Sequence, residues 1–287
     1  MVARDAYHVR SFDELAAEPT VYRDDLFAGR TVLVTGGAGS IGTAICVLLG
    51  RLGASVVACG RRQDRLDALA ADLARIGIDH ETVAMTIRDP DQVAELVERA
   101  WARFGGLDVV VNNAGGQFSA PAVDITPKGW HAVVETNLYG TWYVMQAAAR
   151  RWIAEESPGS VVNIATITGR ASVGIPHTAA SRAGAINLSR SLAVEWAPHN
   201  IRVNCIAVGV VASEGLGTYP ETARPSLAHN PMRRLGDVWD VAQAVAYLAG
   251  PSGDFVTGTT LEVTGGEHVW GEWWPLGKPE WFRTAND

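Results

Sequence analysis

The 287-residue chain has few of the features that mark membrane-spanning, nucleic-acid-binding and secreted proteins. No apolar run reaches the roughly 18 residues that a membrane-spanning helix needs, so we expect no membrane partner. Lys and Arg number 24 against 31 Asp and Glu; the formal net charge is therefore −7, and no basic stripe is present for nucleic acid. Residues 1–7 lack the apolar core of a secretory signal, and residues 284–287 are not a peroxisomal address.

Cysteine is also scarce. Cys46, Cys59 and Cys205 are odd in number and widely spaced among apolar neighbours, which argues against a disulfide framework and against a metal site. We interpret all three as small buried core residues. We therefore expect no bound metal and a reducing, cytoplasmic location.

Hydrophobic residues make up 47% of the chain and charged residues 19%, which is too apolar for a disordered protein. Short β-branched runs alternate with longer segments of helical spacing, the pattern of right-handed β-α-β units with a parallel sheet. The predicted strands are 31–35, 55–59, 82–86, 108–112, 160–165, 201–206 and 260–264. The predicted helices are 41–52, 65–76, 91–104, 130–152, 179–196 and 238–248. No linker divides the chain, so we predict one doubly wound α/β domain over residues 29–266.

Three segments break this alternation. Residues 1–28 are polar and acidic, and we expect an arm that leads into the domain. Residues 214–234 carry three prolines and are long for a loop, so we expect a flap over a site at the carboxyl ends of the strands. The tail, residues 267–287, holds four of the ten tryptophans. It must pack on its own core or on a neighbouring subunit, and the sequence leaves both open.

A glycine-rich turn, residues 35–42, follows the first predicted strand and opens the first predicted helix. Its glycines permit a tight turn and close approach of the backbone to phosphate, and the helix N-terminus favours an anion. A turn without ligand is the alternative, but the strand–turn–helix context favours dinucleotide binding. The predicted binding residues here are Gly36, Gly39, Ser40, Ile41 and Gly42.

The end of the second strand bears on the choice between NAD and NADP. An acidic residue at this place would hold the ribose 2′-hydroxyl and repel a 2′-phosphate. This chain has Arg61 and Arg62 instead, and guanidinium groups pair well with phosphate. We predict NADP(H) as cofactor, with both arginines at the phosphate; a solvated start of a helix is the alternative.

The fourth predicted strand ends in Asn-Asn-Ala-Gly-Gly at residues 112–116. Its small residues would let a cofactor lie across the strand ends, so Asn113, Ala114 and Gly115 join the predicted binding residues. The amide of Asn113 can also brace neighbouring strands.

These motifs together identify a resemblance to the short-chain dehydrogenase/reductases, from about residue 29 to residue 266. Further matches are Asn137 within Glu-Thr-Asn-Leu-Tyr-Gly, residues 161–166, residues 192–204 and the closing residues 261–266. The resemblance implies a single Rossmann-type domain with a seven-stranded parallel sheet in the order 3-2-1-4-5-6-7. It also implies a nicotinamide cofactor and usually a homotetramer.

A narrower resemblance rests on residues 115–118, 128–137 and 177–184. These segments are similar to the peroxisomal-type trans-2-enoyl-CoA reductases and, less closely, to the 2,4-dienoyl-CoA reductases. Both groups use NADPH to reduce a carbon–carbon double bond of an acyl-CoA.

The chain departs from the superfamily at its catalytic positions. Most members carry a Ser together with Tyr-x-x-x-Lys, in which the tyrosine gives a proton to a carbonyl oxygen and the lysine holds the ribose. The corresponding residues here are Thr166, Thr178 and Arg182, and only Asn137 is unchanged. The backbone near Val211 matches a position that meets the nicotinamide carboxamide, and Ser213 matches a hydroxyl position that touches the carboxamide or a phosphate. Valine precedes Gly209 where the superfamily usually has proline.

These replacements favour reduction of an enoyl thioester over reduction of a ketone. A threonine hydroxyl is a far weaker acid than a phenol, and arginine does not relay protons. Threonine hydroxyls can still donate hydrogen bonds to an enolate-like oxygen, Arg182 can hold the ribose, and water can protonate the α-carbon. We therefore predict an NADP(H)-dependent enoyl-thioester reductase acting on a small molecule, with a catalytic site of Asn137, Thr166, Thr178 and Arg182.

Three alternatives remain open. The first is a carbonyl reductase for a 3-oxoacyl thioester, against which the missing Tyr-x-x-x-Lys speaks. The second is a catalytically silent member that binds NADP(H) or forms a hetero-oligomer. The third is a biosynthetic enzyme that uses the same polarising groups for an isomerisation or a double-bond reduction on a non-CoA substrate. His177 is a possible proton source, but we favour a structural role, and we favour packing roles for Tyr139 and Tyr143.

Overall fold

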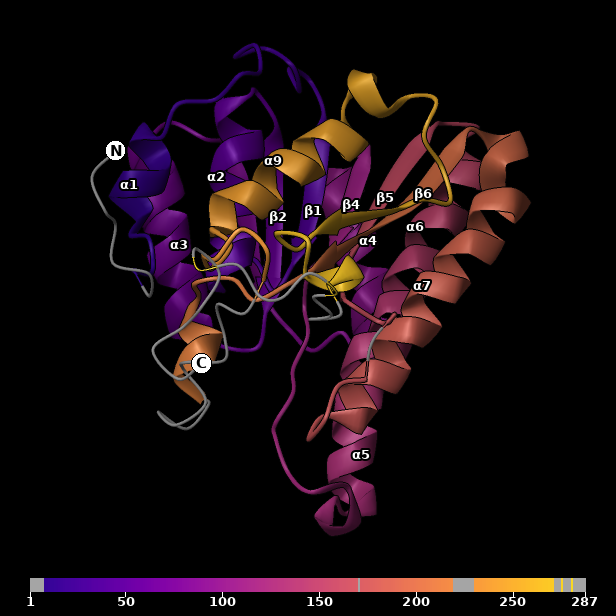
Figure 1. The fold of residues 1–287 in the computed structure, drawn as a ribbon. Helices are drawn as coiled ribbons and strands as arrows, with labels where there is room; N and C mark the ends of the chain where they lie inside the picture. Colours follow the sequence, from indigo (N-terminus) through magenta and orange to yellow (C-terminus); the bar gives the residue numbers. More distant parts are fainter. Residues whose placement is uncertain (1–7, 170, 219–229, 271–274, 276–279, 281–287) are drawn as a thin grey trace.

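A seven-stranded parallel sheet forms the centre of the molecule (Figure 1). The computed structural model describes residues 8–169, 171–218, 230–270, 275 and 280. The strands are β1 (Thr31–Thr35), β2 (Ser55–Gly60), β3 (His80–Ala84), β4 (Val109–Asn112), β5 (Gly159–Thr166), β6 (Ile201–Val208) and β7 (Thr260–Val263). Their order is β3-β2-β1-β4-β5-β6-β7, which confirms the predicted order. The third strand begins and ends two residues earlier than predicted, because His80 pairs with Val56 of β2.

Helices cover both faces of this sheet, since alternate strand residues point to opposite sides. Val32 and Val34 belong to a core with α2 (Ser40–Arg51), α3 (Gln63–Arg75) and α9 (Val238–Ala249). Leu33 belongs to a second core with α4 (Pro90–Phe104), α6 (Thr141–Ala154) and α7 (Pro176–Trp196). This is the doubly wound architecture that the alternation predicts.

The segment expected as an arm contains a short helix, α1 (Phe12–Ala17), which the polar composition did not reveal. A capping box of Ser11 and Glu14 begins α1. Leu15 and Phe27 are fully buried in the core beside α2 and α9. Residues 8–28 therefore pack as part of the domain.

The predicted helix 130–152 is three consecutive helical segments. Thr126 caps α5 (Pro127–Val134), with its hydroxyl accepting from the N–H of Gly129 at 3.1 Å. A π-helical segment, Glu135–Gly140, joins α5 to α6, and α5 projects past the carboxyl ends of the strands (Figure 1). Residue periodicity could not reveal this widened turn, which carries Asn137.

Short 3₁₀ turns occur at Ala122–Asp124, Ala197–His199, Glu214–Thr218, Pro251–Gly253 and Glu267–Val269.

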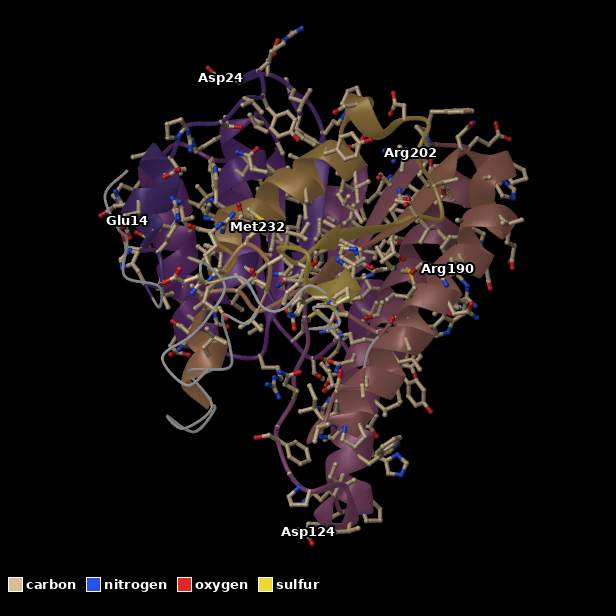
Figure 2. All side chains as sticks on the ribbon, in the orientation of Figure 1. Glu14, Asp24, Asp124, Arg190, Arg202 and Met232 are labelled. Carbon is tan, nitrogen blue, oxygen red and sulfur yellow. The ribbon has the colours of Figure 1, made fainter. Side chains whose placement is uncertain are left out.

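The amino and carboxyl ends of the strands lie at opposite ends of the molecule. Asp24 lies at the end that carries the amino ends of the strands, and Asp124 lies at the opposite end (Figure 2).

The three cysteines, Cys46, Cys59 and Cys205, are free and buried as predicted. Burial raises the pKa of Cys59 to about 12 and that of Cys205 to about 11. In the described part of the chain, no helix is both long and apolar enough to cross a membrane.

Candidate active site

Two adjoining cavities lie at the carboxyl ends of the strands. One, of about 580 Å³, is lined by Thr178 and Arg182, and we call it the Thr178 chamber. The other, of about 420 Å³, is lined by the glycine-rich turn and Arg61, and we call it the Arg61 chamber. Both are lined by Ile41, Asn113, Gly115, Ser213 and Gly215. The chambers therefore adjoin, and we refer to the two together as the groove.

The glycine-rich turn closes tightly because it has no side chains where the backbone crosses itself. Gly36 has φ +64°, and a Cβ on Gly42 would lie 2.2 Å from the carbonyl oxygen of Gly36. Gly39 is the N-cap of α2 and offers no side chain to the N–H groups of the first turn. These groups, on Ser40 and its neighbours, make this end of the groove suitable for an anion.

The Arg61 chamber is strongly cationic. Its charged lining residues are Arg61, Arg62, Arg65, Arg88 and Glu214. Arg88 donates to Thr136 Oγ1 and to the carbonyl of Ala132, each at 2.7 Å, and Arg65 pairs with Glu214. Within the described residues, no hydrogen bond or ion pair neutralises Arg61 or Arg62. Two guanidinium groups thus remain available to a bound phosphate.

Asn113 braces the ends of β1 and β4, as predicted. Its Nδ2 donates to the carbonyls of Thr35 and Gly36 at 3.1 Å. Thr35 Oγ1 in return accepts from the N–H groups of Asn113, at 3.1 Å, and Ala114, at 3.0 Å. These hydrogen bonds hold the ends of β1 and β4 together where Asn113 lines both chambers.

Asn137 holds the loop that follows β4. Its Oδ1 accepts from the N–H of Gly116 and its Nδ2 donates to the carbonyl of Gly116, both at 3.0 Å. Nδ2 also lies 3.4 Å from Ser181 Oγ. The side chain is fully buried, so its amide ties the π-helical segment to the chamber wall.

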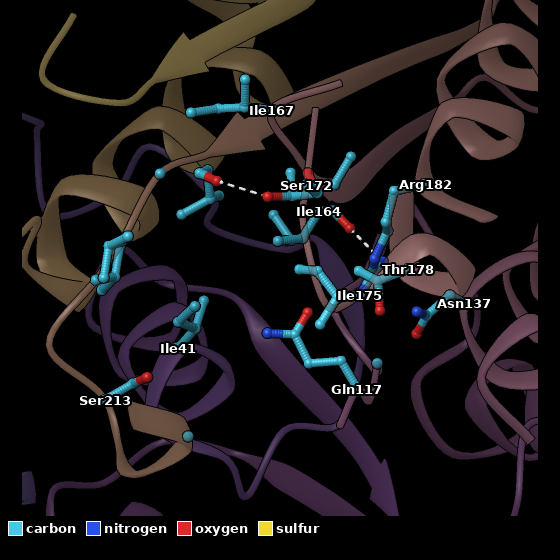
Figure 3. A pocket seen from close by; sticks show the side chains of 18 of the residues that line it. Ile41, Gln117, Asn137, Ile164, Ile167, Ser172, Ile175, Thr178, Arg182 and Ser213 are labelled. Atoms are coloured by element: carbon cyan, nitrogen blue, oxygen red, sulfur yellow. Dashed lines mark hydrogen bonds between the residues drawn. The ribbon is translucent and has the colours of Figure 1, made fainter. Parts of the chain in front are cut away.

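Arg182 brings a positive charge into the Thr178 chamber. Its Nη1 donates to the carbonyl of Ile164 at 2.6 Å, the contact drawn as a dashed line in Figure 3. Burial lowers the pKa of Arg182 to about 10, so the guanidinium keeps its charge at neutral pH. Within the described residues, no carboxylate forms a salt bridge with it.

The two threonines of the site differ in their hydrogen bonds. Thr178, in the first turn of α7, is buried, and its Oγ1 has no hydrogen-bond partner among the described residues. Thr166 ends β5, and its Oγ1 donates to the carbonyl of Val208 at 3.2 Å. Both line the same chamber, but of the two hydroxyls only that of Thr178 lacks a partner among the residues that the structure describes.

Val211 and Ser213 lie on the segment that continues β6. Val211 forms a parallel bridge with Gly236, and the N–H of Ala212 donates to the carbonyl of Gly236 at 2.8 Å. Ser213 lines both chambers. The backbone of this segment therefore lies beside the groove at the place where the chambers join.

The remaining acid–base candidates lie outside the groove. The described lining residues of the Thr178 chamber include no tyrosine, lysine or histidine. Tyr139 is 46% exposed, and Tyr143 lines a separate groove between α4 and α6. The fully buried ring of His177 accepts from the N–H of Thr178 at 2.9 Å and meets Phe118 edge-on at 4.5 Å. These positions support the structural role expected for His177 and the packing role expected for Tyr143, which packs against the core of α4 and α6. The packing role expected for Tyr139 is not supported within the chain, because its side chain is largely exposed.

Sequence reasoning missed other lining residues. The Gln117 side chain extends into the Thr178 chamber, opposite an apolar wall that includes Ile164 and Ile175 (Figure 3). Glu267 is the one carboxylate among the described lining residues of this chamber. Gln117 directly follows the Asn-Asn-Ala-Gly-Gly run, which was a usable signal, whereas Glu267 reaches the site only through the fold.

Two of the predicted segments lie partly outside the described residues. These parts are residues 219–229 of the expected flap and, in the tail, Trp273, Trp274 and Trp281.

The fold and this groove agree with a known family. The family model described as Enoyl-(Acyl carrier protein) reductase matches residues 36–268. The chain therefore belongs to the short-chain dehydrogenase/reductase family of oxidoreductases, whose members bind nicotinamide cofactors.

Individual relatives are similar over most of their length. The "Probable 2,4-dienoyl-CoA reductase" of Bacillus subtilis is 32% identical over 244 residues, covering 83% of this chain and 96% of that protein. The 3-oxoacyl-(acyl-carrier-protein) reductase of Thermotoga maritima is 34% identical, covering 83% and 97%. A citronellol catabolism dehydrogenase of Pseudomonas aeruginosa superimposes with a TM-score of 0.78 at 33% identity, covering 87% and 99%. These matches confirm the resemblance to this family and to its 2,4-dienoyl-CoA reductases.

Proposed function

We propose that this protein is an NADP(H)-dependent reductase of enoyl thioesters. One observation carries the proposal: a buried threonine hydroxyl without a partner and a charged arginine, Thr178 and Arg182, line a chamber whose described residues include no phenol. This set of groups can stabilise negative charge on an oxygen but has no ready proton for it.

The groove fits a dinucleotide along its whole length. The first turn of α2 suits the diphosphate, and Arg61 and Arg62 suit the 2′-phosphate of the adenosine ribose. Arg182 suits the nicotinamide ribose, and the backbone at Val211 and Ser213 suits the carboxamide. The segment after β4 lies beside the middle of the dinucleotide in this arrangement, and its lining residues are Asn113, Ala114 and Gly115.

The side chains of the Thr178 chamber act on the substrate oxygen. A bound NADPH would supply the hydride that adds to the β-carbon, and negative charge would then develop on the thioester oxygen. The Thr178 hydroxyl and the Gln117 amide donate hydrogen bonds to that oxygen, and the Arg182 charge stabilises it further. Thr166 can join them when its hydroxyl turns away from Val208. Water then delivers the proton to the α-carbon.

Ketone reduction makes a different demand on the same chamber. The oxygen that gains charge must itself receive a proton, and a threonine hydroxyl is too weak an acid to give one at neutral pH. Relatives named as 2,4-dienoyl-CoA reductases support the enoyl reaction, whereas the relative named as a 3-oxoacyl reductase represents the alternative.

The protein is also proposed to work as a homo-oligomer, a tetramer by family resemblance. Val194 on α7 and Phe255 after α9 are largely exposed apolar side chains, which supports burial against another copy. Small-angle scattering or light scattering measures the assembled mass; a monomer at working concentration contradicts this part.

Oxidation of NADPH, followed by absorbance, tests the proposed reaction. The substrates are crotonyl-CoA, a longer 2-enoyl-CoA and a 3-oxoacyl-CoA of matched length. Turnover of the enoyl substrates alone supports the proposal. Turnover of the 3-oxoacyl substrate alone contradicts it, and tight NADPH binding without any turnover identifies a silent member of the family.

A further inference from the structure

Glu214 contacts two residues from different elements of the fold. Its carboxylate pairs with the guanidinium of Arg65, in the first turn of α3. Its backbone N–H donates to Ser40 Oγ, at the start of α2, at 3.1 Å. All three residues line the Arg61 chamber. No local sequence signal links them, since Ser40 and Glu214 are 174 positions apart.

We propose that these two contacts form a clasp over the groove that slows release of the bound coenzyme. The inference rests on the coenzyme-binding part of the proposed function. The clasp is defined as Ser40, Arg65 and Glu214.

The position of the clasp follows from what the two chambers share. Ser213 and Gly215, on either side of Glu214, line both chambers. A dinucleotide that extends through both chambers therefore passes the segment that carries Glu214. The coenzyme leaves more easily when this segment moves away, and that movement breaks both clasp contacts.

The strength of the clasp suits a barrier that opens in every turnover. The Arg65 and Glu214 side chains are 34% and 58% exposed, so water and salt screen their attraction. An ion pair of this kind changes a rate by a few-fold rather than by orders of magnitude. The hydrogen bond from Glu214 to Ser40 involves the backbone and remains when the carboxylate is changed.

A simpler role for Glu214 makes the opposite prediction. It is the one acid among the described charged residues lining the Arg61 chamber, so it can also repel a 2′-phosphate. If repulsion is its main effect, removing the charge slows NADPH release and leaves NADH release unchanged. If the clasp is its main effect, removing the charge speeds the release of both coenzymes.

Stopped-flow displacement of NADPH and of NADH from the full-length protein, followed by nicotinamide fluorescence, separates the two roles. For Glu214→Gln we expect both dissociation rates to rise about threefold at low salt, with the difference from the unmodified protein shrinking at high salt. Asp79→Asn is the matched control, because it disrupts the Arg103–Asp79 pair, 2.8 Å long and 50% and 57% exposed, before β3 at the amino ends of the strands. We expect that control to leave both rates unchanged.

A charge exchange gives a second measurement. Arg65→Glu and Glu214→Arg each place like charges together and should speed NADH release. The double variant restores opposite charges and should return the NADH rate toward that of the unmodified protein. NADH is the probe here because it has no 2′-phosphate to interact with the exchanged charges.

The outcomes separate the clasp from the proposed function. Unchanged release rates in Glu214→Gln, or slower release confined to NADPH, contradict the clasp while leaving the enoyl reductase in place. If the unmodified protein binds neither coenzyme, the proposed function fails and the clasp fails with it.

Discussion

The guanidinium of Arg182 lies directly against the backbone of Gly115. A Cβ added at Gly115 would be 1.9 Å from Nη2 of Arg182. The other terminal nitrogen of the same arginine, Nη1, donates to the carbonyl of Ile164 at 2.6 Å. The charge can therefore occupy the Thr178 chamber only because the loop after β4 has no side chain at this position.

Gly115→Ala should consequently displace the guanidinium rather than unfold the protein, because Arg182 is a flexible side chain. We expect the Kd for NADPH to rise about tenfold, the loss of one charge-assisted contact, and kcat to fall as well. Fluorescence titration and steady-state kinetics measure the two effects. Gly116→Ala is the control, since a Cβ there meets no atom within 4 Å. Equal losses in both variants would show that the loop, and not Arg182, is responsible.

Thr178→Val should separate catalysis from stability. The hydroxyl has no partner in the described structure, so its removal should change the free energy of unfolding by less than about 0.5 kcal/mol. The loss of one donor to the substrate oxygen should lower kcat about 100-fold, with the Kd for NADPH unchanged. Thr178→Ser should recover most of the rate.

Thr166→Val provides the comparison for that result. Its hydroxyl already donates to Val208, so the variant should lose about 1 kcal/mol of stability in denaturant unfolding. We expect a smaller loss of kcat than for Thr178→Val. A larger loss would make Thr166 the principal donor and would overturn the order of roles given above.

Arg61→Asp should alter coenzyme preference. Arg61 is exposed, lines the chamber and has no partner among the described residues, so a 2′-phosphate is its natural counter-ion. We expect the Kd for NADPH to rise about tenfold or more, with little change for NADH. Arg103→Asp makes the same change of charge at the amino ends of the strands and should affect neither. Equal weakening of both coenzymes would remove Arg61 from the phosphate site.

Arg10→Met should show that the N-terminal segment stabilises the domain. The Arg10 side chain is 6% exposed, donates to Asp237 Oδ2 at 2.6 Å and also pairs with Glu18. Its removal leaves two carboxylates, each 25% exposed, without this partner. We expect a loss of about 2 kcal/mol in the free energy of unfolding, below the value for a fully buried pair. Denaturant unfolding with Arg23→Met as control is the measurement, because the Arg23–Asp25 pair is exposed and should contribute little.

The sequence pattern predicted a parallel sheet because central parallel strands are apolar on both faces. The order of its strands came from the family resemblance, and the structure confirms that order. The sequence pattern missed what depends on partners far along the chain. Leu15 and Phe27 looked like part of a polar arm, yet both are buried against α2 and α9. The edge strand β3 was displaced by two residues, because it is only half-buried and its pattern is weak.

The candidate site shows the same division. Local motifs pointed to the glycine-rich turn, Arg61 and Asn113, whereas Thr178 and Arg182 were found through the family resemblance. The sequence could not show that the side-chain amide of Asn137 forms hydrogen bonds with the backbone of Gly116, because that contact depends on a π-helical turn. Long-range contacts, such as that of Glu214 with Ser40, exist only once the fold has formed.

The fate of a labelled hydride tests the central claim most directly. The protein is incubated with NADPH carrying deuterium at the transferable position of the nicotinamide and with a 2-enoyl-CoA, and the product is examined by NMR. The account predicts a saturated acyl thioester with deuterium at the β-carbon and a solvent proton at the α-carbon. Recovery of unchanged enoyl substrate, together with deuterium on the hydroxyl-bearing carbon when a 3-oxoacyl-CoA is supplied instead, would contradict it.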